Sequence, residues 1–447
     1  MSLNYSFSCL LIIYFNLLNT INAQSFDYYN DNLILNCHHY NQNIGFSQIT
    51  NINNKLLDPI IKLNSSDELQ LSFDIFENSY NGSYAYTFIH CNANWALSTI
   101  SQYDYIDGYT NNFIENYSYS FNTTTSYINY NITFPNRDIQ FSKSGNYILL
   151  IYDSDTNKPL ITKRFIIYED LISIDINVKQ ATLVQDINKK HEIDFSITNY
   201  TSLNISNFYN DINVIVQQNN DWNNIITNLH PSFINRDVIE FNYYDEISFL
   251  AGSEYRDFDT KNLGYYGNGI QSYNQLAFND SSLFSHIQTK GKSYHNIGLY
   301  KDYPNDIVSY SFQYDLNGKY VISVGNNKNK KNESDYALVN FSLQLNELKN
   351  NHIYIYGELT NYHLANKHRM TYNHILKKYE GSLYLKQGYY NYKYILTDTM
   401  EKEIENVIEL NYKETRNKYT IYVYHTPIWL EYDRIVGIIK STSNTLN

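Results

Sequence analysis

The stretch of sequence that decides the fold is Leu69–Trp95, which reads LQLSFDIFENSYNGSYAYTFIHCNANW. Its first seven residues alternate between apolar and polar, which is the period of a half-buried β-strand. Asn81-Gly82 is a pair that tolerates positive φ angles, as the turn of a β-hairpin requires. In Tyr84–Cys91 the residues of both faces are suited to burial. We therefore expect a β-hairpin inside a β-sandwich, followed by a distinctive segment, His90–Trp95.

The composition of the whole chain also indicates strands. Its 447 residues are enough for about three domains. They include 48 tyrosines and 22 phenylalanines, and isoleucine and asparagine are abundant as well. Tyrosine and isoleucine favour strands, whereas asparagine favours turns. We find no convincing amphipathic helix of more than three turns, so we predict an all-β chain of tandem immunoglobulin-like or early-set β-sandwich domains.

Changes of rhythm along the chain predict four segments. Residues 1–23 contain a mostly apolar run and an acceptable cleavage site, and we interpret them as a signal peptide, with a buried N-terminal strand as the alternative. Residues 24–170 are predicted to form an N-terminal β-sandwich, residues 171–330 a middle β domain with long loops, and residues 331–447 a C-terminal early-set-like β-sandwich. No later apolar run has the roughly 20 residues that a membrane-spanning helix needs.

Charge and motifs exclude several classes of function. The formal net charge is -12, whereas binding to nucleic-acid phosphates requires a basic surface. The patterns G-x-S-x-G, H-E-x-x-H and C-x-x-C are absent from the sequence. We therefore expect no nucleic-acid partner, no cofactor, no metal site and no catalytic residue.

His90 and Cys91 could suggest a thiol–imidazole pair or half of a metal site. Neighbouring residues of a strand point to opposite faces, however, so these two side chains cannot readily meet. The structural interpretation makes Asn92 and Asn94 turn residues and Trp95 a core anchor. Because strand geometry disfavours the catalytic pair, we prefer the structural interpretation.

Cys37 and Cys91 are the two cysteines that follow the predicted signal peptide. In an oxidising compartment they could form a disulfide, which would contribute roughly 4 kcal/mol. The sequence cannot place their Cα atoms within reach of each other. A Cys37–Cys91 disulfide and two free thiols therefore both stay open.

Ala251–Asp259 concentrates acidic residues around one arginine, Arg256. A functional interpretation is a calcium site or a hydrolase that uses the carboxylates of Glu254, Asp257 and Asp259. The structural interpretation is a pair between Arg256 and a carboxylate, with the aromatic residues packed inward. Two-carboxylate catalysis needs a cleft that sequence cannot show, so we prefer the structural pair.

Several motifs, taken in order, match one known family. In the first domain they are Leu71–Asp74, Tyr86–Trp95, Tyr105–Gly108, Ser120–Thr123 and Ser144–Tyr147; in the second, Gln218-Asn219, Gly252–Asp259 and Asp315–Gly318; in the third, Leu385–Tyr392 and Tyr432-Asp433. With these motifs the chain resembles the type IX secretion system plug protein family. The resemblance extends over most of the chain after the predicted signal peptide.

The resemblance implies a non-enzymatic periplasmic protein, exported by its signal peptide and associated with the inner face of the outer membrane. Such a protein docks on the outer-membrane β-barrel translocon and plugs its periplasmic opening when the channel is idle. Two of the matched segments are candidate contact loops, although folding roles are the preferred alternative. The candidate contact residues are His90, Asn92, Asn94, Trp95, Glu254, Arg256 and Asp257.

Two other functions serve as alternatives to the plug. Residues 353–396 are similar to early-set sandwiches of the glycogen-binding type, which suggests a glycan-binding protein with Tyr362 or Tyr390 in the site. That type usually carries a tryptophan where this chain has Tyr362, so we keep the similarity of fold and do not expect starch binding. The last alternative is the carboxylate-based hydrolase.

Overall fold

The computed structural model describes residues 33–76, 82–277, 293–305, 310–325 and 332–443. The predicted signal peptide, residues 1–23, and Asn81 of the predicted turn lie outside the described residues. Within these ranges the chain folds into short strands and loops with a few single-turn helices, so the predicted all-β fold is confirmed. The strands build three β-sandwiches, which we call the first, second and third sandwich.

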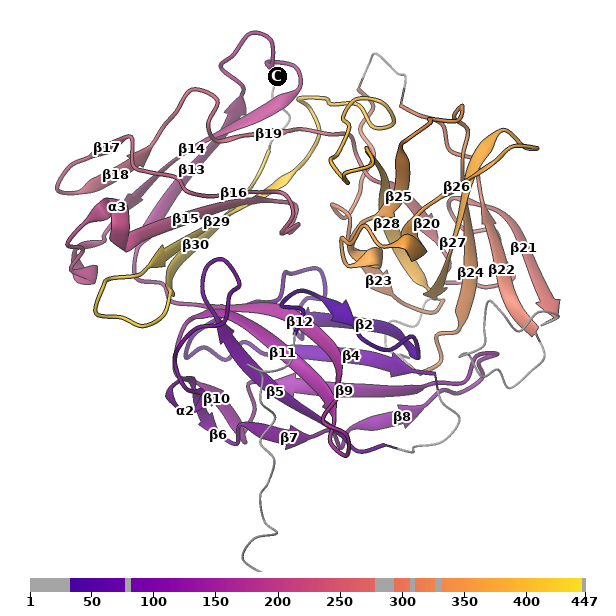
Figure 1. The fold of residues 1–447 in the computed structure, drawn as a ribbon, viewed down its shortest axis with the longest axis horizontal. Helices are drawn as coiled ribbons and strands as arrows, with labels where there is room; N and C mark the ends of the chain where they lie inside the picture. Colours follow the sequence, from indigo (N-terminus) through magenta and orange to yellow (C-terminus); the bar gives the residue numbers. More distant parts are fainter. Residues whose placement is uncertain (1–32, 77–81, 278–292, 306–309, 326–331, 444–447) are drawn as a thin grey trace, which may run out of the picture. The chain divides into compact units, whose positions relative to one another are not determined.

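The first sandwich has two main sheets that pack face to face around one hydrophobic core (Figure 1). One sheet has the order β1 (His38–His39), β12 (Pro159–Tyr168), β11 (Gly145–Asp153), β5 (Tyr84–Cys91) and β7 (Asn111–Phe113), with β3 (Ile60–Lys62) parallel to β12. The other sheet has the order β2 (Ile44–Asn51), β4 (Leu69–Ile75), β9 (Ile128–Phe134) and β8 (Tyr117–Tyr119). A separate ribbon consists of β6 (Ile106–Gly108) and β10 (Ile139–Phe141), next to α2 (Gln102–Tyr105).

The two strands of Leu69–Trp95 lie in facing sheets, so the predicted hairpin is wrong. β4 pairs with β2 and β9, whereas β5 pairs with β11 and β7. Tyr84 of β5 meets Tyr130 of the opposite sheet edge-to-face, with ring centroids 5.3 Å apart. The alternation of residues identifies strands correctly, but it does not tell whether two successive strands pair or cross from one sheet to the other.

The second sandwich combines residues 173–250 with the C-terminal strands. One sheet has the order β13 (Ser173–Gln180), β14 (Lys190–Thr198), β18 (Val238–Phe241) and β17 (Phe233–Ile234), and β19 (Ser248–Leu250) also pairs with β14. The other has the order β16 (Ile225–Ile226), β15 (Ile212–Gln218), β29 (Lys418–His425) and β30 (Arg434–Thr442). Two short helical turns are η1 (Thr201–Leu203) and α3 (Phe208–Asp211).

The third sandwich uses the strands between residues 256 and 397. One sheet has the order β20 (Arg256–Asp259), β28 (Gly388–Thr397) and β23 (Tyr320–Ile322), and β25 (His352–Tyr356) also pairs with β28. The other has the order β21 (Ile270–Ala277), β22 (Ser293–Leu299), β24 (Tyr336–Leu343), β27 (Lys378–Lys386) and β26 (Thr371–Asn373). Two 3₁₀ turns are η2 (Glu358–Thr360) and η3 (Asn366–His368).

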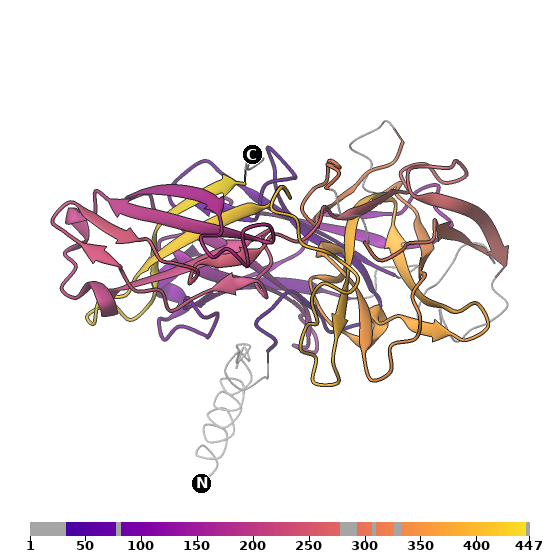
Figure 2. The ribbon, with the colours of Figure 1, turned by 90° about the horizontal axis from the view of Figure 1, so that it is seen from above.

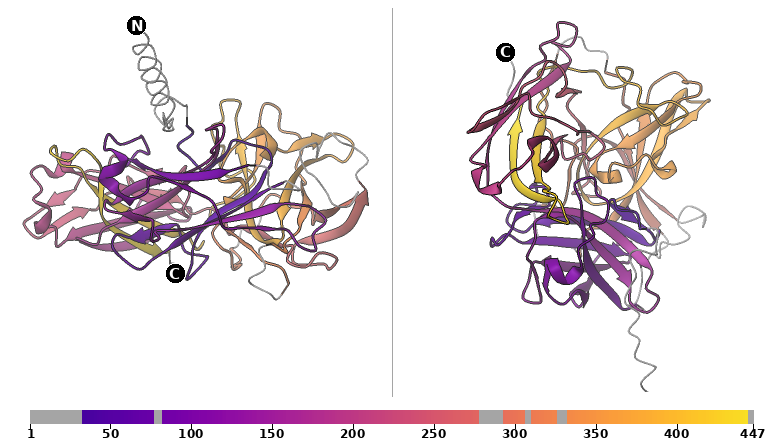
Figure 3. Two further views of the ribbon diagram at one scale, coloured as in Figure 1. Left: turned by 90° about the horizontal axis from the view of Figure 1, so that it is seen from below. Right: turned by 60° about the vertical axis from the view of Figure 1, so that its left-hand side comes forward.

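The sheets cross the predicted domain boundary at residues 330/331. β29 and β30 belong to the predicted C-terminal domain, yet β29 pairs with β15 along its whole length, and Figures 2 and 3 show these yellow strands among the strands of residues 173–250. Conversely, β20–β22 come from the predicted middle domain but pair into the third sandwich. In place of the predicted boundaries we propose a second domain of residues 171–250 with 418–443, and a third of residues 251–417.

Candidate functional site

His90, the first residue of the distinctive segment, is a buried residue at the end of β5. Its side chain is 1% exposed. Its Nε2–H donates to the carbonyl oxygen of Ser144 at 3.1 Å, and Nδ1 lies 2.9 Å from the Ser98 hydroxyl. Gly145 makes room for the ring, because a Cβ there would lie 2.2 Å from His90 Nε2. Burial lowers the pKa of His90 to about 4, so it is a neutral residue with both nitrogens bonded.

Trp95 closes the same segment against the second sandwich. Its side chain is 5% exposed, and its ring meets Trp222 edge-to-face with centroids 5.0 Å apart. The guanidinium carbon of Arg164 lies 4.2 Å from the Trp95 ring centroid, a cation–π arrangement. Trp95 is thus buried, as the structural interpretation expects of an anchor, but it lies between two sandwiches and not in the core of the first.

Asn92 and Asn94 form the turn between these two residues. Asn146 Nδ2 donates to the carbonyl oxygen of Asn92 at 2.9 Å, and the Asn94 side chain accepts from the amide of Ala96 at 2.9 Å. Of the four candidate contact residues in this segment, Asn94 alone is exposed. The segment therefore serves mainly to join parts of the chain.

Both cysteines are free thiols in the structure. Cys91 is completely buried, and burial raises the pKa of its thiol to about 12. Cys37 is partly buried. Of the two alternatives that the sequence leaves open, the structure has the two thiols and not the disulfide.

Arg256, at the start of β20, forms the structural ion pair expected for the second segment. Its Nε and Nη2 donate to the two carboxylate oxygens of Glu409 at 3.1 and 3.2 Å. Its Nη1 donates to Asp302 at 3.3 Å, and Asp302 also accepts from the hydroxyl of Tyr394 at 2.6 Å. A guanidinium held by both oxygens of one carboxylate is a strong and specific contact. The partners lie far away in the sequence, so the segment alone could not name them.

The carboxylates of the hydrolase hypothesis do not form a pair. Glu254, Asp257 and Asp259 are each engaged by different groups, and each is partly buried. The partners are the Tyr310 hydroxyl and the Arg416 amide for Glu254, Asn268 and Gln313 for Asp257, and Lys261 for Asp259. In the described ranges, no three His, Cys, Asp or Glu residues are grouped so that they could hold a metal ion.

Of the two residues of the predicted glycan site, Tyr390 is used inside the third sandwich, whereas Tyr362 is partly exposed. Tyr390 is buried and stacks between Phe258 and Tyr320, at centroid distances of 5.1 and 5.2 Å. The hydroxyl of Tyr362 is buried too. The buried ring of Tyr390 cannot serve as an open platform for a sugar, whereas a glycan site at Tyr362 stays a prediction.

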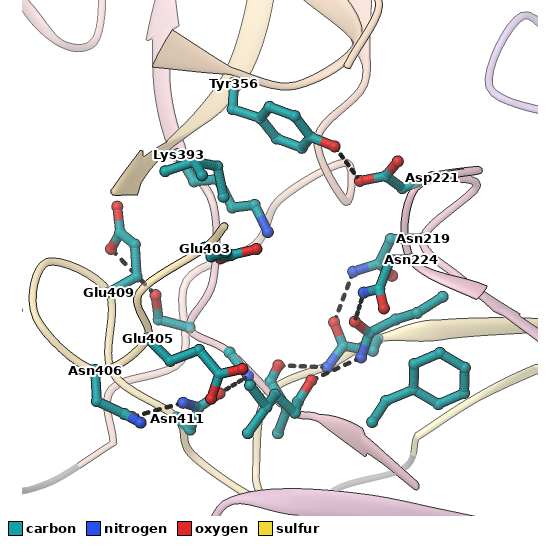
Figure 4. Close-up of a pocket in the computed structure, with 18 of the residues that line it drawn as sticks. Asn219, Asp221, Asn224, Tyr356, Lys393, Glu403, Glu405, Asn406, Glu409 and Asn411 are labelled. Atoms are coloured by element: carbon teal, nitrogen blue, oxygen red, sulfur yellow. Dashed lines mark hydrogen bonds between the residues drawn. The ribbon is translucent and has the colours of Figure 1, made fainter. Parts of the chain in front are cut away.

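A polar cavity of about 350 Å³ lies between the second and third sandwich (Figure 4). Gly252, Ser253 and Tyr255 of the predicted segment line one side of it. Its volume is within the range of small-molecule sites, about 300–1,000 Å³. The cavity leaves no signal in the sequence, because its walls come from distant parts of the chain.

Asparagine side chains fix the cavity wall. Asn219 Nδ2 donates to Asn417 Oδ1 at 2.7 Å, and Asn224 Nδ2 donates to Gln218 Oε1 at 2.6 Å. On the opposite side, Asn411 accepts from the backbone amide of Gly252 at 2.8 Å. Because these amides are bonded to the protein itself, the wall keeps its shape without a ligand.

The charged groups of the cavity differ in how they are bonded. Asp221 accepts from the Tyr356 hydroxyl at 2.7 Å, and Glu409 is held by Arg256. Lys393 extends into the cavity (Figure 4), where its ammonium lies 5.5 Å from the ring centroid of Tyr356 and makes no hydrogen bond within the described part of the chain. Burial lowers the pKa of Lys393, but neighbouring groups, Tyr255 and Glu403 among them, outweigh this effect and raise it, so the amine is protonated. Glu403, on the same cavity, has a pKa that burial raises.

A buried ion pair closes the contact between the first and third sandwich. Lys386 of β27 bonds to Asp74 of β4, and both side chains are at most 1% exposed. Asp74 also accepts from the Tyr336 hydroxyl and from Asn129 Nδ2, each at 2.6 Å. The Lys386 ammonium lies 4.3 Å from the ring centroid of Tyr127. Both charges therefore have partners, and neither side chain is more than 1% exposed.

Asp58 joins all three sandwiches. Its carboxylate is 1% exposed and accepts from Lys319 of the third sandwich at 2.6 Å. Two lysines of the second sandwich contact the same carboxylate: Lys440 at 2.9 Å, and Lys418. Burial alone raises the pKa of Asp58, but the three ammonium groups outweigh it and hold the pKa below its usual range. We call this group the lysine cluster.

Comparisons with known proteins find one matching family and one similar crystal structure. The family described as "Type 9 secretion system plug protein 1st domain" matches residues 44–169. A crystal structure of a hypothetical protein from Parabacteroides merdae ATCC 43184 is 30% identical with a TM-score of 0.84, and the match covers 92% of this chain and 100% of that chain. The C-terminal domain of the Streptococcus pyogenes antigen I/II-family protein AspA is 8% identical with a TM-score of 0.15, over 90% of this chain and 99% of that chain, which is too weak for an argument.

Two negative findings remain, one from the curated proteins and one from the helices of the structure. No curated protein matches the chain. In the part of the chain that the structure describes, no helix is long and apolar enough to cross a membrane.

Proposed function

Because the chain belongs to the type 9 secretion system plug protein family, we propose that it docks on the outer-membrane β-barrel translocon of this system and closes its periplasmic opening when the channel is idle. The observation that carries the proposal is the family match over residues 44–169, which include nearly all of the first sandwich. In this proposal the chain is a non-enzymatic component. It is exported by an N-terminal signal peptide and acts in the periplasm at the inner face of the outer membrane.

The internal contacts support a plug because a plug has to keep its shape against a large partner. The Asp74–Lys386 pair and the lysine cluster join strands that are far apart in the sequence. Breaking a buried ion pair leaves an uncompensated charge in the interior and costs about 3–5 kcal/mol. The sandwiches are therefore coupled strongly and resist opening at these contacts.

We place the contact surface on the edge of the first sandwich that β7 and β8 form (Figure 1). Each of these strands ends one of the two main sheets. Phe113 of β7 is 66% exposed, and Tyr117, Tyr119 and Phe121 on and after β8 are exposed as well. Aromatic side chains are enriched in protein interfaces, where they bury much area at low entropic cost. This aromatic edge replaces the two segments whose side chains are mostly used within the chain.

The test is recovery of the translocon from detergent-solubilised outer membranes with the full chain as bait. We expect a very large β-barrel protein to be recovered with the natural sequence. Replacing Phe113 and Tyr119 by serine should reduce recovery at least tenfold, because the apolar area of the edge is lost. The matched control is Tyr265→Ser, which changes an exposed tyrosine outside this edge. If the translocon stays intact in the detergent but the natural chain recovers none of it, the proposal is wrong.

A further inference from the structure

Three charged groups at the cavity between the second and third sandwich lack hydrogen-bond partners. They are the ammonium of Lys393 and the carboxylates of Glu403 and Glu405, for which no hydrogen bond or ion pair is found within the described residues. Lys393 is half-buried, whereas Glu403 and Glu405 lie at the exposed rim. The amides of the wall are bonded to one another, so these charges are the groups that a ligand would meet.

The signs of the charges restrict the ligand. The lining includes four carboxylates and one ammonium: Asp221, Glu403, Glu405, Glu409 and Lys393. An anion could accept from Lys393 but would be repelled by the carboxylates around it. A cation could donate to Glu403 and Glu405 but would be repelled by Lys393 and would leave its three N–H groups without an acceptor. Neither charged class satisfies both kinds of group.

A hydroxyl group satisfies both, because it donates one hydrogen bond and accepts others. Water that enters a polar cavity can bridge an ammonium and a carboxylate that make no direct hydrogen bond. A ligand gains affinity from displacing such water only if it reproduces the hydrogen bonds of the water, and a set of hydroxyls on a small ring does so. The size of the cavity, about 350 Å³, limits such a ligand to a small molecule or to the end of a chain.

We propose that this cavity binds a neutral saccharide of one or two units. Lys393 donates to ring or hydroxyl oxygens, and the Glu403 and Glu405 carboxylates accept from hydroxyl groups of the same sugar. The bonded asparagines hold the wall in position, so little conformational entropy is lost on binding. The proposal goes beyond the plug function and does not depend on it, since the cavity is lined by the second and third sandwich alone.

The test is isothermal titration of the full chain with defined probes. The neutral probes are glucose, galactose, N-acetylglucosamine, maltose and N,N′-diacetylchitobiose; the charged probes are arginine amide and glutamate. We expect at least one neutral sugar to bind and both charged probes to bind at least tenfold more weakly. A soluble polysaccharide of the same sugar unit tests whether the ligand is a free sugar or the end of a polysaccharide chain. Equal affinity per unit indicates a free sugar, and tighter binding of the polymer indicates a chain end. If none of the sugars binds, or if a charged probe binds as well as any sugar, the proposal is overturned.

Variants of the cavity complete the test. Lys393→Met should reduce sugar affinity roughly tenfold or more, and Glu403→Gln should reduce it severalfold, because each removes a charged hydrogen-bond partner. The matched control is Lys402→Met, which changes an exposed lysine near Glu403 in the sequence and should leave affinity unchanged. Thermal unfolding shows that each variant is folded, and translocon recovery by Lys393→Met should equal that of the natural chain. Unchanged affinity in both cavity variants would contradict the proposed site even if a sugar binds.

Discussion

The third sandwich contacts its two neighbours in opposite ways, although both contacts contain a lysine and carboxylates. Towards the first sandwich, Lys386 bonds directly to Asp74, and both side chains are at most 1% exposed. Towards the second sandwich, Lys393 extends into a cavity of about 350 Å³ and has acidic neighbours without a direct hydrogen bond, as far as the described residues show. We call the first the closed contact and the second the open contact.

The difference shows how the same pair of charges serves two purposes. In the closed contact the charges are removed from water, so their mutual bond and the donors Tyr336 and Asn129 have to replace hydration. Such a contact is specific and difficult to open. In the open contact the charges line a cavity large enough for water, so we expect little stability to depend on them and a ligand to be able to replace the water. Stability and binding are thus assigned to different contacts of one sandwich.

The largest effect is expected at the closed contact. Lys386→Met leaves the Asp74 carboxylate buried without its ammonium, and we expect the free energy of unfolding to fall by about 3–5 kcal/mol, measured by denaturant unfolding. The double variant with Asp74→Asn leaves no net charge in the interior and keeps an acceptor for the Tyr336 hydroxyl. It should therefore recover part of the loss. A single variant within 1 kcal/mol of the natural chain would show that this contact is not closed in solution.

The lysine cluster should give the next largest effect. Asp58→Asn removes the only carboxylate that Lys319, Lys418 and Lys440 share in the described part of the chain, and we expect a loss of about 3 kcal/mol. The folded-state pKa of Asp58 is lowered, so its contribution is present above the unfolded-state pKa of about 3.9 and is lost as the pH falls towards the folded-state pKa. The matched control is Asp170→Asn in the exposed Lys62–Asp170 pair, which should change stability by less than about 1 kcal/mol. Equal effects of the two substitutions would contradict the special role of Asp58.

His90 tests a third contact, between the first sandwich and the loop that joins β29 to β30, through its pH dependence. The ring packs edge-to-face on Tyr432 with centroids 5.3 Å apart, and burial lowers its folded-state pKa to about 4. Between pH 6.5 and 4 the unfolded chain binds a proton that the folded chain does not, so stability falls as the pH is lowered through this range. The contribution of His90 to the loss between pH 7 and pH 5 should be about 2 kcal/mol.

Denaturant unfolding at these two pH values measures this contribution as the difference between the natural chain and His90→Gln. The variant should lose less stability than the natural chain on going from pH 7 to pH 5. His374→Gln, which changes an exposed histidine, is the control and should leave the pH dependence unchanged. If His90→Gln and the natural chain lose the same stability, the ring of His90 is accessible to solvent and is not buried at this contact.

The sequence predicts much of the local structure and little of what joins it. Alternation identified β4 as a strand, and residues suited to burial on both faces identified β5, because burial leaves a direct imprint on residue order. It did not reveal that β4 and β5 cross between sheets, nor that β29 pairs with β15, because pairing over a long distance leaves no such imprint. The structural interpretation of Trp95 followed from the segment itself, whereas its partner Trp222 could not be named.

For the candidate sites, too, the sequence indicates local features but not the partners that lie far away in the chain. Arg256 was expected to pair with a carboxylate, and the sequence signal was its own acidic neighbourhood, yet its main partners are Glu409 and Asp302. Asp58 stands between Leu57 and Pro59, and nothing in the residues around it indicates three lysines from other sandwiches. The cavity combines residues as distant as Asp221 and Glu403. Only the pairing of β15 with β29 and of β20 with β28 brings its walls together.

The smallest effect should be found at the open contact, with the same substitution that has the largest effect at the closed one. Lys393→Met removes an ammonium that has no direct hydrogen bond within the described residues, and the acidic groups left behind keep their water. We therefore expect the free energy of unfolding to fall by less than about 1 kcal/mol, because the attraction of the ammonium to Glu403 and Asp221 is lost. Denaturant unfolding of Lys386→Met and Lys393→Met side by side compares the two contacts directly. A loss of stability for Lys393→Met as large as that for Lys386→Met would mean that Lys393 is bonded and dehydrated in solution. The two contacts would then not differ. Lys393 would also lack the unpaired ammonium on which sugar binding depends.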